Sequence, residues 1–144
     1  MHLPPPLQRA LEELISQSDH AELAAAAKRV SKDYRSAERS ASTTFLRDPH
    51  ERLAYAATRL PATYAASYAA LSHLRMLWPQ CPLSSMLDIG SGSGAASWAA
   101  CTLFESLNSA TLFERDPYLV ALGQQLAGST AFPIMDDAQW NTCF

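Results

Sequence analysis

The sequence has little that supports metal, disulfide or membrane chemistry. Its three cysteines, Cys81, Cys101 and Cys143, are far apart and share no metal-ligand spacing, and its four histidines form no ligand pattern. We therefore expect reduced thiols and no metal site. No apolar run reaches the ~18 residues of a membrane-spanning helix. The first residues also lack the basic start and apolar core of a signal peptide.

Positive charge is scarce in the second half of the chain. Residues 76–144 contain one arginine, Arg115, against six acidic residues, whereas residues 1–75 contain ten Lys and Arg against eight acidic residues. A domain that binds nucleic acid by itself is usually far more basic than this. We therefore expect no DNA partner, and we expect any RNA contact to come from the N-terminal half or from a partner.

Glycine is also rare, and its distribution is informative. Three of the five glycines, Gly90, Gly92 and Gly94, fall in one loop between a short apolar segment and an alanine-rich segment. A strand, a glycine turn and a helix in that order present backbone N–H groups to a nucleotide-like ligand. Asp88 precedes the first glycine by two positions and would repel the pyrophosphate of a dinucleotide. A ligand with an ammonium group, such as S-adenosylmethionine, would be attracted to it.

The chain divides into a helical half and an α/β half. In the first half we predict helices over 7–16, from the Ser18–Asp19 cap to Tyr34, and from Asp48 to Trp78 with a break or kink at Pro61, and a loop over 35–46. In the second half we predict strands over 85–89 and 110–114 and helices over 94–106 and 117–127. The βαβα order predicts an α/β fold with a parallel sheet. We place a helical region at 1–80 and a Rossmann-like region at 81–144.

An acidic residue ends the second predicted strand. Glu114 lies 24 residues after Gly90, where nucleotide-binding α/β units place an acid that accepts hydrogen bonds from ribose hydroxyls. Asp116 precedes Pro117 and therefore fits the cap of the next helix better. The residues predicted to bind a ligand are Asp88, Gly90, Ser91, Gly92, Gly94 and Glu114. Gly90, Gly92 and Ala95 also fit the looser dinucleotide pattern, so an NAD-dependent oxidoreductase stays open.

Several stretches resemble known methyltransferases. The glycine loop, DIGSGSG at 88–94, resembles the first signature of class I S-adenosylmethionine-dependent methyltransferases. The segment at 55–66, YAATRLPATYAA, resembles the one that precedes this signature in the Rsm22 family, the mitochondrial and bacterial small-ribosomal-subunit methyltransferase-like proteins. LFERDP at 112–117 and AQW at 138–140 are similar to further stretches of that family. The resemblance spans residues 3 to 144.

This resemblance implies a function, a cofactor and a partner. The function is methyl transfer from S-adenosylmethionine to ribosomal RNA or another component of the small ribosomal subunit. Asp88 would face the methionine end of the cofactor, the glycines would let the backbone approach it, and Glu114 would bind the ribose. We expect a bacterial cytoplasmic location. An assembly factor of the small subunit that keeps the fold without catalysis is the alternative.

The resemblance also implies an incomplete sheet. Family members have a seven-stranded methyltransferase sheet, and this sequence covers its beginning, ending at Phe144 where a third strand would start. We therefore expect a marginally stable chain that is inactive alone. The sequence identifies no catalytic residue, and Asp136 or Asp137 is only a secondary candidate for contact with adenine.

Overall fold

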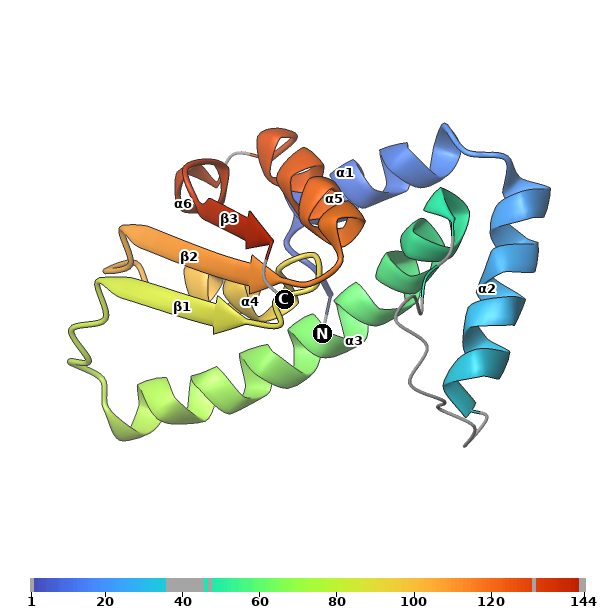
Figure 1. Cartoon of the computed structure of the whole chain (residues 1–144). Helices are drawn as coiled ribbons and strands as arrows, with labels where there is room; N and C mark the ends of the chain where they lie inside the picture. The colour runs from blue at the N-terminus through green and yellow to red at the C-terminus, as the bar shows by residue number, and fades with distance from the viewer. Residues whose placement is uncertain (1, 36–45, 47, 131, 143–144) are drawn as a thin grey trace.

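The computed structural model describes residues 2–35, 46, 48–130 and 132–142, and it places three helices ahead of a small parallel sheet (Figure 1). The helices of the first half are α1 (Pro5–Ser16), α2 (His20–Arg35) and α3 (Pro49–Leu77). The second half contains β1 (Ser85–Ile89), α4 (Ala95–Leu103), β2 (Ser109–Glu114), α5 (Pro117–Gly128), α6 (Pro133–Asp136) and β3 (Gln139–Thr142). The predicted α/β class is confirmed. Of the loop predicted over 35–46, residues 36–45 lie outside the described part, and Arg35 ends α2.

The sheet has the order β1-β2-β3, and all its strands run parallel. Asp88 of β1 lies opposite Leu112 of β2, which in turn lies opposite Trp140 of β3. The expectation that the chain ends before a third strand is wrong. β3 escaped prediction because its four residues, QWNT, are mostly polar and too few to show alternation.

Three aspartates fix the starts of helices, as the sequence predicted. Asp48 accepts a hydrogen bond from the backbone N–H of Glu51 at 2.8 Å at the start of α3. Asp116 accepts one from Tyr118 at 2.9 Å at the start of α5. Asp19 holds the first turn of α2 in the same way. Each carboxylate satisfies an N–H group that has no partner inside its helix.

Helix α3 runs from Pro49 to Leu77 through Pro61, so the first of the two predicted alternatives, a break into two helices, is wrong, and a kink at Pro61 stays a prediction. A proline inside a helix removes one backbone hydrogen bond and costs about 3 kcal/mol. Burial on both sides of the proline offsets this cost, since Leu60 and Tyr64 are only 2% and 3% exposed. Both side chains belong to the main hydrophobic core.

The main core lies between one face of the sheet and the helices that cover it. It joins Trp98 of α4, Leu112 of β2, Leu126 of α5 and Met135 of α6, all fully buried, to Leu7 of α1. Right-handed crossovers in one direction along a sheet put successive helices on the same face, which explains this one-sided arrangement. The helical and Rossmann-like regions share this core, and their boundary at residue 80 stays a prediction.

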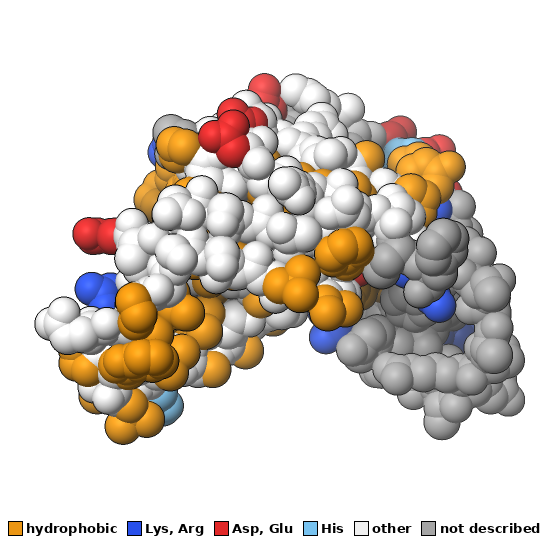
Figure 2. Space-filling model, turned by 60° about the vertical axis from the view of Figure 1, so that its left-hand side comes forward, with side chains coloured by type: hydrophobic (Ala, Val, Ile, Leu, Met, Phe, Trp, Pro, Cys, Tyr) orange, Lys and Arg blue, Asp and Glu red, His pale blue; other side chains and the backbone are white. Residues whose placement is uncertain are grey.

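The opposite face of the sheet is open toward the viewer in Figure 1. Leu87 and Ile89 of β1 point to it and are 61% and 75% exposed. Parallel sheets are normally covered on both faces. Further exposed hydrophobic side chains, including Leu77 and Trp78, gather where α3 ends (Figure 2). The described part of the molecule therefore shows two apolar surfaces in addition to its core.

The described residues form neither a membrane-spanning helix nor a cluster of metal ligands. No helix there is both long and apolar enough to cross a membrane. Within the same residues, no three or more His, Cys, Asp or Glu side chains come together as a set that could hold a metal ion.

Candidate functional site

The glycine loop between β1 and α4 has a backbone that other residues rarely adopt. The φ angles of Gly90, Gly92 and Gly94 are +79°, +56° and +89°, all in the left-handed region. A Cβ atom built on Gly90 or Gly92 would meet no atom within 4 Å, so the space beside this backbone is open. A Cβ on Gly94 would lie 3.0 Å from the indole of Trp140. The first two glycines thus face open space, and the third lies against the core.

Hydrogen bonds fix this loop against the end of β2. The N–H groups of Gly90 and Ser91 both donate to the carbonyl of Phe113, at 2.8 and 3.0 Å. Gly94 donates back to the carbonyl of Ser91 at 2.8 Å, which closes the turn. The loop is therefore held in shape by the chain itself.

The carboxylate of Glu114 joins the loop to the start of α5. One of its oxygens accepts a hydrogen bond from the N–H of Gly92 at 2.9 Å, and the other accepts one from the N–H of Asp116 at 2.9 Å. A carboxylate oxygen has two lone pairs, so each retains one for a further donor. A ribose diol would supply two such donors.

Asp88 lies on the same face of the sheet as Glu114. It is opposite Leu112, and Glu114 is two residues further along β2, so the two carboxylates project from neighbouring strands on one side. One oxygen of Asp88 accepts a hydrogen bond of 2.7 Å from the hydroxyl of Ser97, which is itself buried. The structure thus brings both acids predicted from the sequence to the same end of the sheet.

A cavity of about 480 Å³ opens at this end of the sheet. Three of the predicted residues, Gly90, Gly92 and Glu114, line it. Asp88, Ser91 and Gly94 are not among its lining residues. The hydroxyl of Ser91 is buried within the loop and has no hydrogen-bond partner among the described residues.

Sequence reasoning missed the contribution of α3 to this cavity. Arg52 and Tyr55 both line it, opposite the glycine loop. Arg52 is 7% exposed, lies 3.5 Å from the carboxylate of Asp116 through its Nε, and stacks 3.7 Å above the ring centroid of Tyr118. Nothing in the local pattern distinguishes Arg52 from a solvent-exposed arginine in the first turns of a helix. Tyr55 begins the 55–66 stretch that resembles the Rsm22 family, which was the available signal.

The cavity combines charges of both signs. Arg52 and Arg115 supply positive charge, and Glu114 and Asp116 supply negative charge. Such a lining suits a ligand that carries both signs together with hydroxyl groups, and it suits a polyanion poorly.

The fold and this site define a Rossmann-like α/β region with a glycine loop and a strand-end acid. The model of a family described as mitochondrial small ribosomal subunit Rsm22 matches residues 49–143, from α3 to β3. The chain belongs to the Rsm22 family. The match is narrower than the span of 3 to 144 expected from the sequence, and α1 and α2 lie outside it.

Two curated relatives come from Schizosaccharomyces pombe. They are Rsm22-cox11 tandem protein 2, mitochondrial, and Rsm22-cox11 tandem protein 1, mitochondrial. Each is 32% identical over 80 residues, which cover 54% of this chain and 10% of the relative. The matched part of the chain therefore spans about a tenth of the length of these relatives.

The expected bacterial cytoplasmic location is contradicted by these comparisons. The family and both relatives are described as mitochondrial. The expectation came from the absence of a recognisable targeting segment at the start of the sequence, which is weak ground because an absence in one segment excludes few locations.

Proposed function

We propose that this chain forms the S-adenosylmethionine-binding part of a methyltransferase that acts on ribosomal RNA or another component of the small ribosomal subunit. The observation that supports it best is the hydrogen bond between Glu114 and the N–H of Gly92. It joins the acid at the end of β2 to the glycine loop within one cavity. Acid and loop in this arrangement are typical of sites for nucleosides.

Four of the six predicted residues have a stated part in this proposal. Glu114 accepts hydrogen bonds from the ribose hydroxyls with its remaining lone pairs. Gly90 and Gly92 leave open space in which the ligand approaches the backbone. Asp88 supplies negative charge on the same face of the sheet, toward the positively charged methionine end. Bound S-adenosylmethionine supplies an activated methyl group, and the protein's main task is then to place the acceptor in line with it.

The proposed partner is a small ribosomal subunit or its RNA. This part of the proposal rests on the description of the family and on membership of it. The net charge of −3 argues against strong independent binding to RNA. In this proposal, other proteins or other parts of a larger assembly make the main contacts with RNA.

An assembly factor that keeps the fold without catalysis is the second candidate. It is favoured because the carboxylates of Glu114 and Asp116 at the cavity already make hydrogen bonds within the chain. Both oxygens of Glu114 hold backbone N–H groups, and Asp116 caps α5 while lying beside Arg52. These contacts serve the fold, and a chain that keeps the fold without catalysis would keep them too.

Isothermal titration of the 144-residue chain tests ligand binding. We expect S-adenosylmethionine and S-adenosylhomocysteine to bind and NAD to show no heat of binding. Glu114→Ala should abolish the signal, and Glu105→Ala, at an exposed position away from the cavity, should leave it unchanged. Binding of NAD in place of S-adenosylmethionine would favour the oxidoreductase, and binding of neither would overturn the proposal.

Methyl transfer separates the enzyme from the assembly factor. Because we expect the chain to be inactive alone, small ribosomal subunits are incubated with a full-length Rsm22 protein that contains it and with S-adenosylmethionine labelled on its methyl group. Label in RNA or ribosomal protein supports the enzyme. Ligand binding with no transferred label supports the assembly factor.

A further inference from the structure

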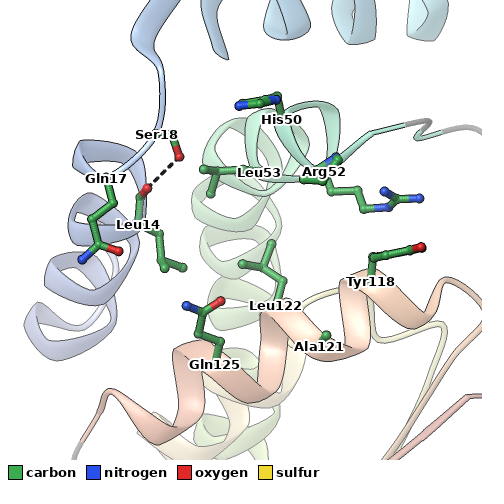
Figure 3. Close-up of a pocket in the computed structure, with 11 residues that line it drawn as sticks. Leu14, Gln17, Ser18, His50, Arg52, Leu53, Tyr118, Ala121, Leu122 and Gln125 are labelled. Atoms are coloured by element: carbon green, nitrogen blue, oxygen red, sulfur yellow. Dashed lines mark hydrogen bonds between the residues drawn. The ribbon is translucent and has the colours of Figure 1, made fainter. Parts of the chain in front are cut away.

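A second cavity shares two lining residues with the proposed ligand cavity, and Figure 3 shows the residues that line it. Its volume is about 380 Å³, and it lies between α1, α3 and α5. Leu14, Leu53 and Leu122 give it an apolar lining, and Gln17 and Gln125 stand at its rim.

Arg52 and Tyr118 line both cavities. The guanidinium of Arg52 stacks on the ring of Tyr118 at 3.7 Å, as Figure 3 shows. Arg52 is further held by Asp116. The stacked arginine and tyrosine stabilise each other where the two cavities meet.

We infer that the Arg52–Tyr118 pair limits the size of the base that the ligand cavity accepts, and that removing it joins the two cavities. This inference rests on the function proposed above. It identifies two residues that determine which adenine substituents the proposed site accepts.

The position of the ribose decides which end of the ligand meets this pair. The ribose lies at Glu114, and the methionine end lies toward the glycine loop and Asp88. The base is then directed to the remaining part of the cavity, which is lined by Leu46, Arg52, Tyr55 and residues 115–119. An apolar group added to the base would run into the stacked pair. Beyond the pair lies the leucine-lined second cavity, which suits such a group.

The test compares two probes, S-adenosylhomocysteine and its derivative with a benzyl group on the exocyclic amine of adenine. Their dissociation constants are measured by titration with the full chain and its variants. Each variant is described by one ratio, the dissociation constant of the benzyl derivative divided by that of S-adenosylhomocysteine. We expect the unaltered chain to bind the benzyl derivative far more weakly. Tyr118→Ala should reduce that ratio at least about tenfold, since a hydrophobic pocket gains or loses that much with small changes in size.

Two variants complete the design. Arg52→Ala removes the other half of the stacked pair and should reduce the ratio in the same direction. Gln125→Ala enlarges only the second cavity and should leave the ratio unchanged. Tyr118 is 56% exposed, so its removal costs little core packing, and circular dichroism checks that each variant is folded.

The outcomes separate the two proposals. A chain that binds neither probe overturns the proposed function, and this inference with it. A chain that binds both probes equally has no size limit at the stacked pair, which overturns the inference alone. An unchanged ratio in Tyr118→Ala also overturns it alone.

Discussion

The carboxylate of Glu114 holds the backbone N–H of Gly92 at 2.9 Å, across 22 positions of sequence. Together with the hydrogen bonds from Gly90 and Ser91 to the carbonyl of Phe113, this contact makes the end of β2 and the glycine loop one unit. It also gives Glu114 two tasks, one in shaping the loop and one in the proposed contact with ribose.

Glu114→Gln keeps the size of the side chain but removes its charge and one acceptor oxygen, so it tests the hydrogen bonding of Glu114 apart from its packing. The amide has one acceptor oxygen, so it cannot serve the N–H groups of both Gly92 and Asp116. We expect the affinity for S-adenosylmethionine to fall about 10- to 100-fold, the value of one or two hydrogen bonds to a charged group. Isothermal titration measures it, with Glu105→Gln as the control. Equal affinity in the Glu114 and Glu105 variants would show that the charge of Glu114 is not used.

Gly92→Ala distinguishes a ligand-binding loop from an ordinary tight turn. Its Cβ would meet no protein atom within 4 Å, so the folded chain should lose only the cost of a left-handed alanine, about 1–2 kcal/mol. The methyl group would, however, occupy the space where we place the ligand. We expect a loss of S-adenosylmethionine affinity of at least about tenfold.

Gly94→Ala is the comparison for that experiment. Its Cβ would lie 3.0 Å from Trp140 and 3.2 Å from Met135, so its main effect should be on stability, measured by urea unfolding. If Gly92→Ala instead lowers stability strongly and leaves affinity unchanged, the loop is a structural turn.

Gly123→Ala should destabilise the chain through Trp140. A Cβ on this glycine of α5 would overlap the indole ring of Trp140 in β3. Forcing an extra carbon into such a contact typically costs about 1–3 kcal/mol. Gly128→Ala is a matched control in the same helix, since its nearest neighbour would be Asp136 at 3.8 Å. The control should be neutral or slightly stabilising, and equal effects of the two changes in thermal unfolding would contradict the packing described here.

The cap of α3 should make stability depend on pH. Acceptance of the Glu51 backbone N–H lowers the pKa of Asp48 below its ordinary value of 3.8, and Arg29 acts in the same direction. A carboxyl group with a lowered pKa stabilises the fold above its unfolded pKa, and this contribution disappears as the pH falls through the lowered value. Asp48→Ala should therefore cost about 1 kcal/mol at pH 7 and less at pH 2, where the charged part of the contribution is reduced.

Asp48→Asn keeps the cap without the charge and serves as the control for that series. Asparagine is about as good an N-cap as aspartate. Its contribution should be the same at both pH values, apart from the lost contact with Arg29. A pH-independent effect of Asp48→Ala in urea unfolding would show that the ionised carboxylate is not needed.

Local signals in the sequence were sufficient for much of the fold. The apolar segment before Gly90 and the segment before Glu114 predicted β1 and β2, and Asp48 and Asp116 were correctly predicted as caps. These features depend on neighbours within a few residues. The two acids of the candidate site lie at one end of the sheet because parallel strands bring their carboxyl ends together, and their binding of a ligand stays a prediction.

Long-range contacts account for what the sequence did not predict. β3 exists because Trp140 packs against Gly123 and because β2 offers a partner strand. α3 continues through Pro61 because buried neighbours on both sides hold it. Arg52 reaches the cavity only because α3 lies across the end of the sheet, and 64 residues separate it from Asp116. None of these partners is visible in a local pattern.

Along β1, every second backbone amide points away from β2 toward the free edge of the sheet. The carbonyl of Ser84 and the N–H of Gly90 both bond to the β2 side, so the amides of Leu87 and Ile89 point the other way. In heavy water these two amides should take up deuterium quickly while those of Met86 and Asp88 retain hydrogen. Slow uptake at the two outward positions would then report that another polypeptide has come to lie along this strand.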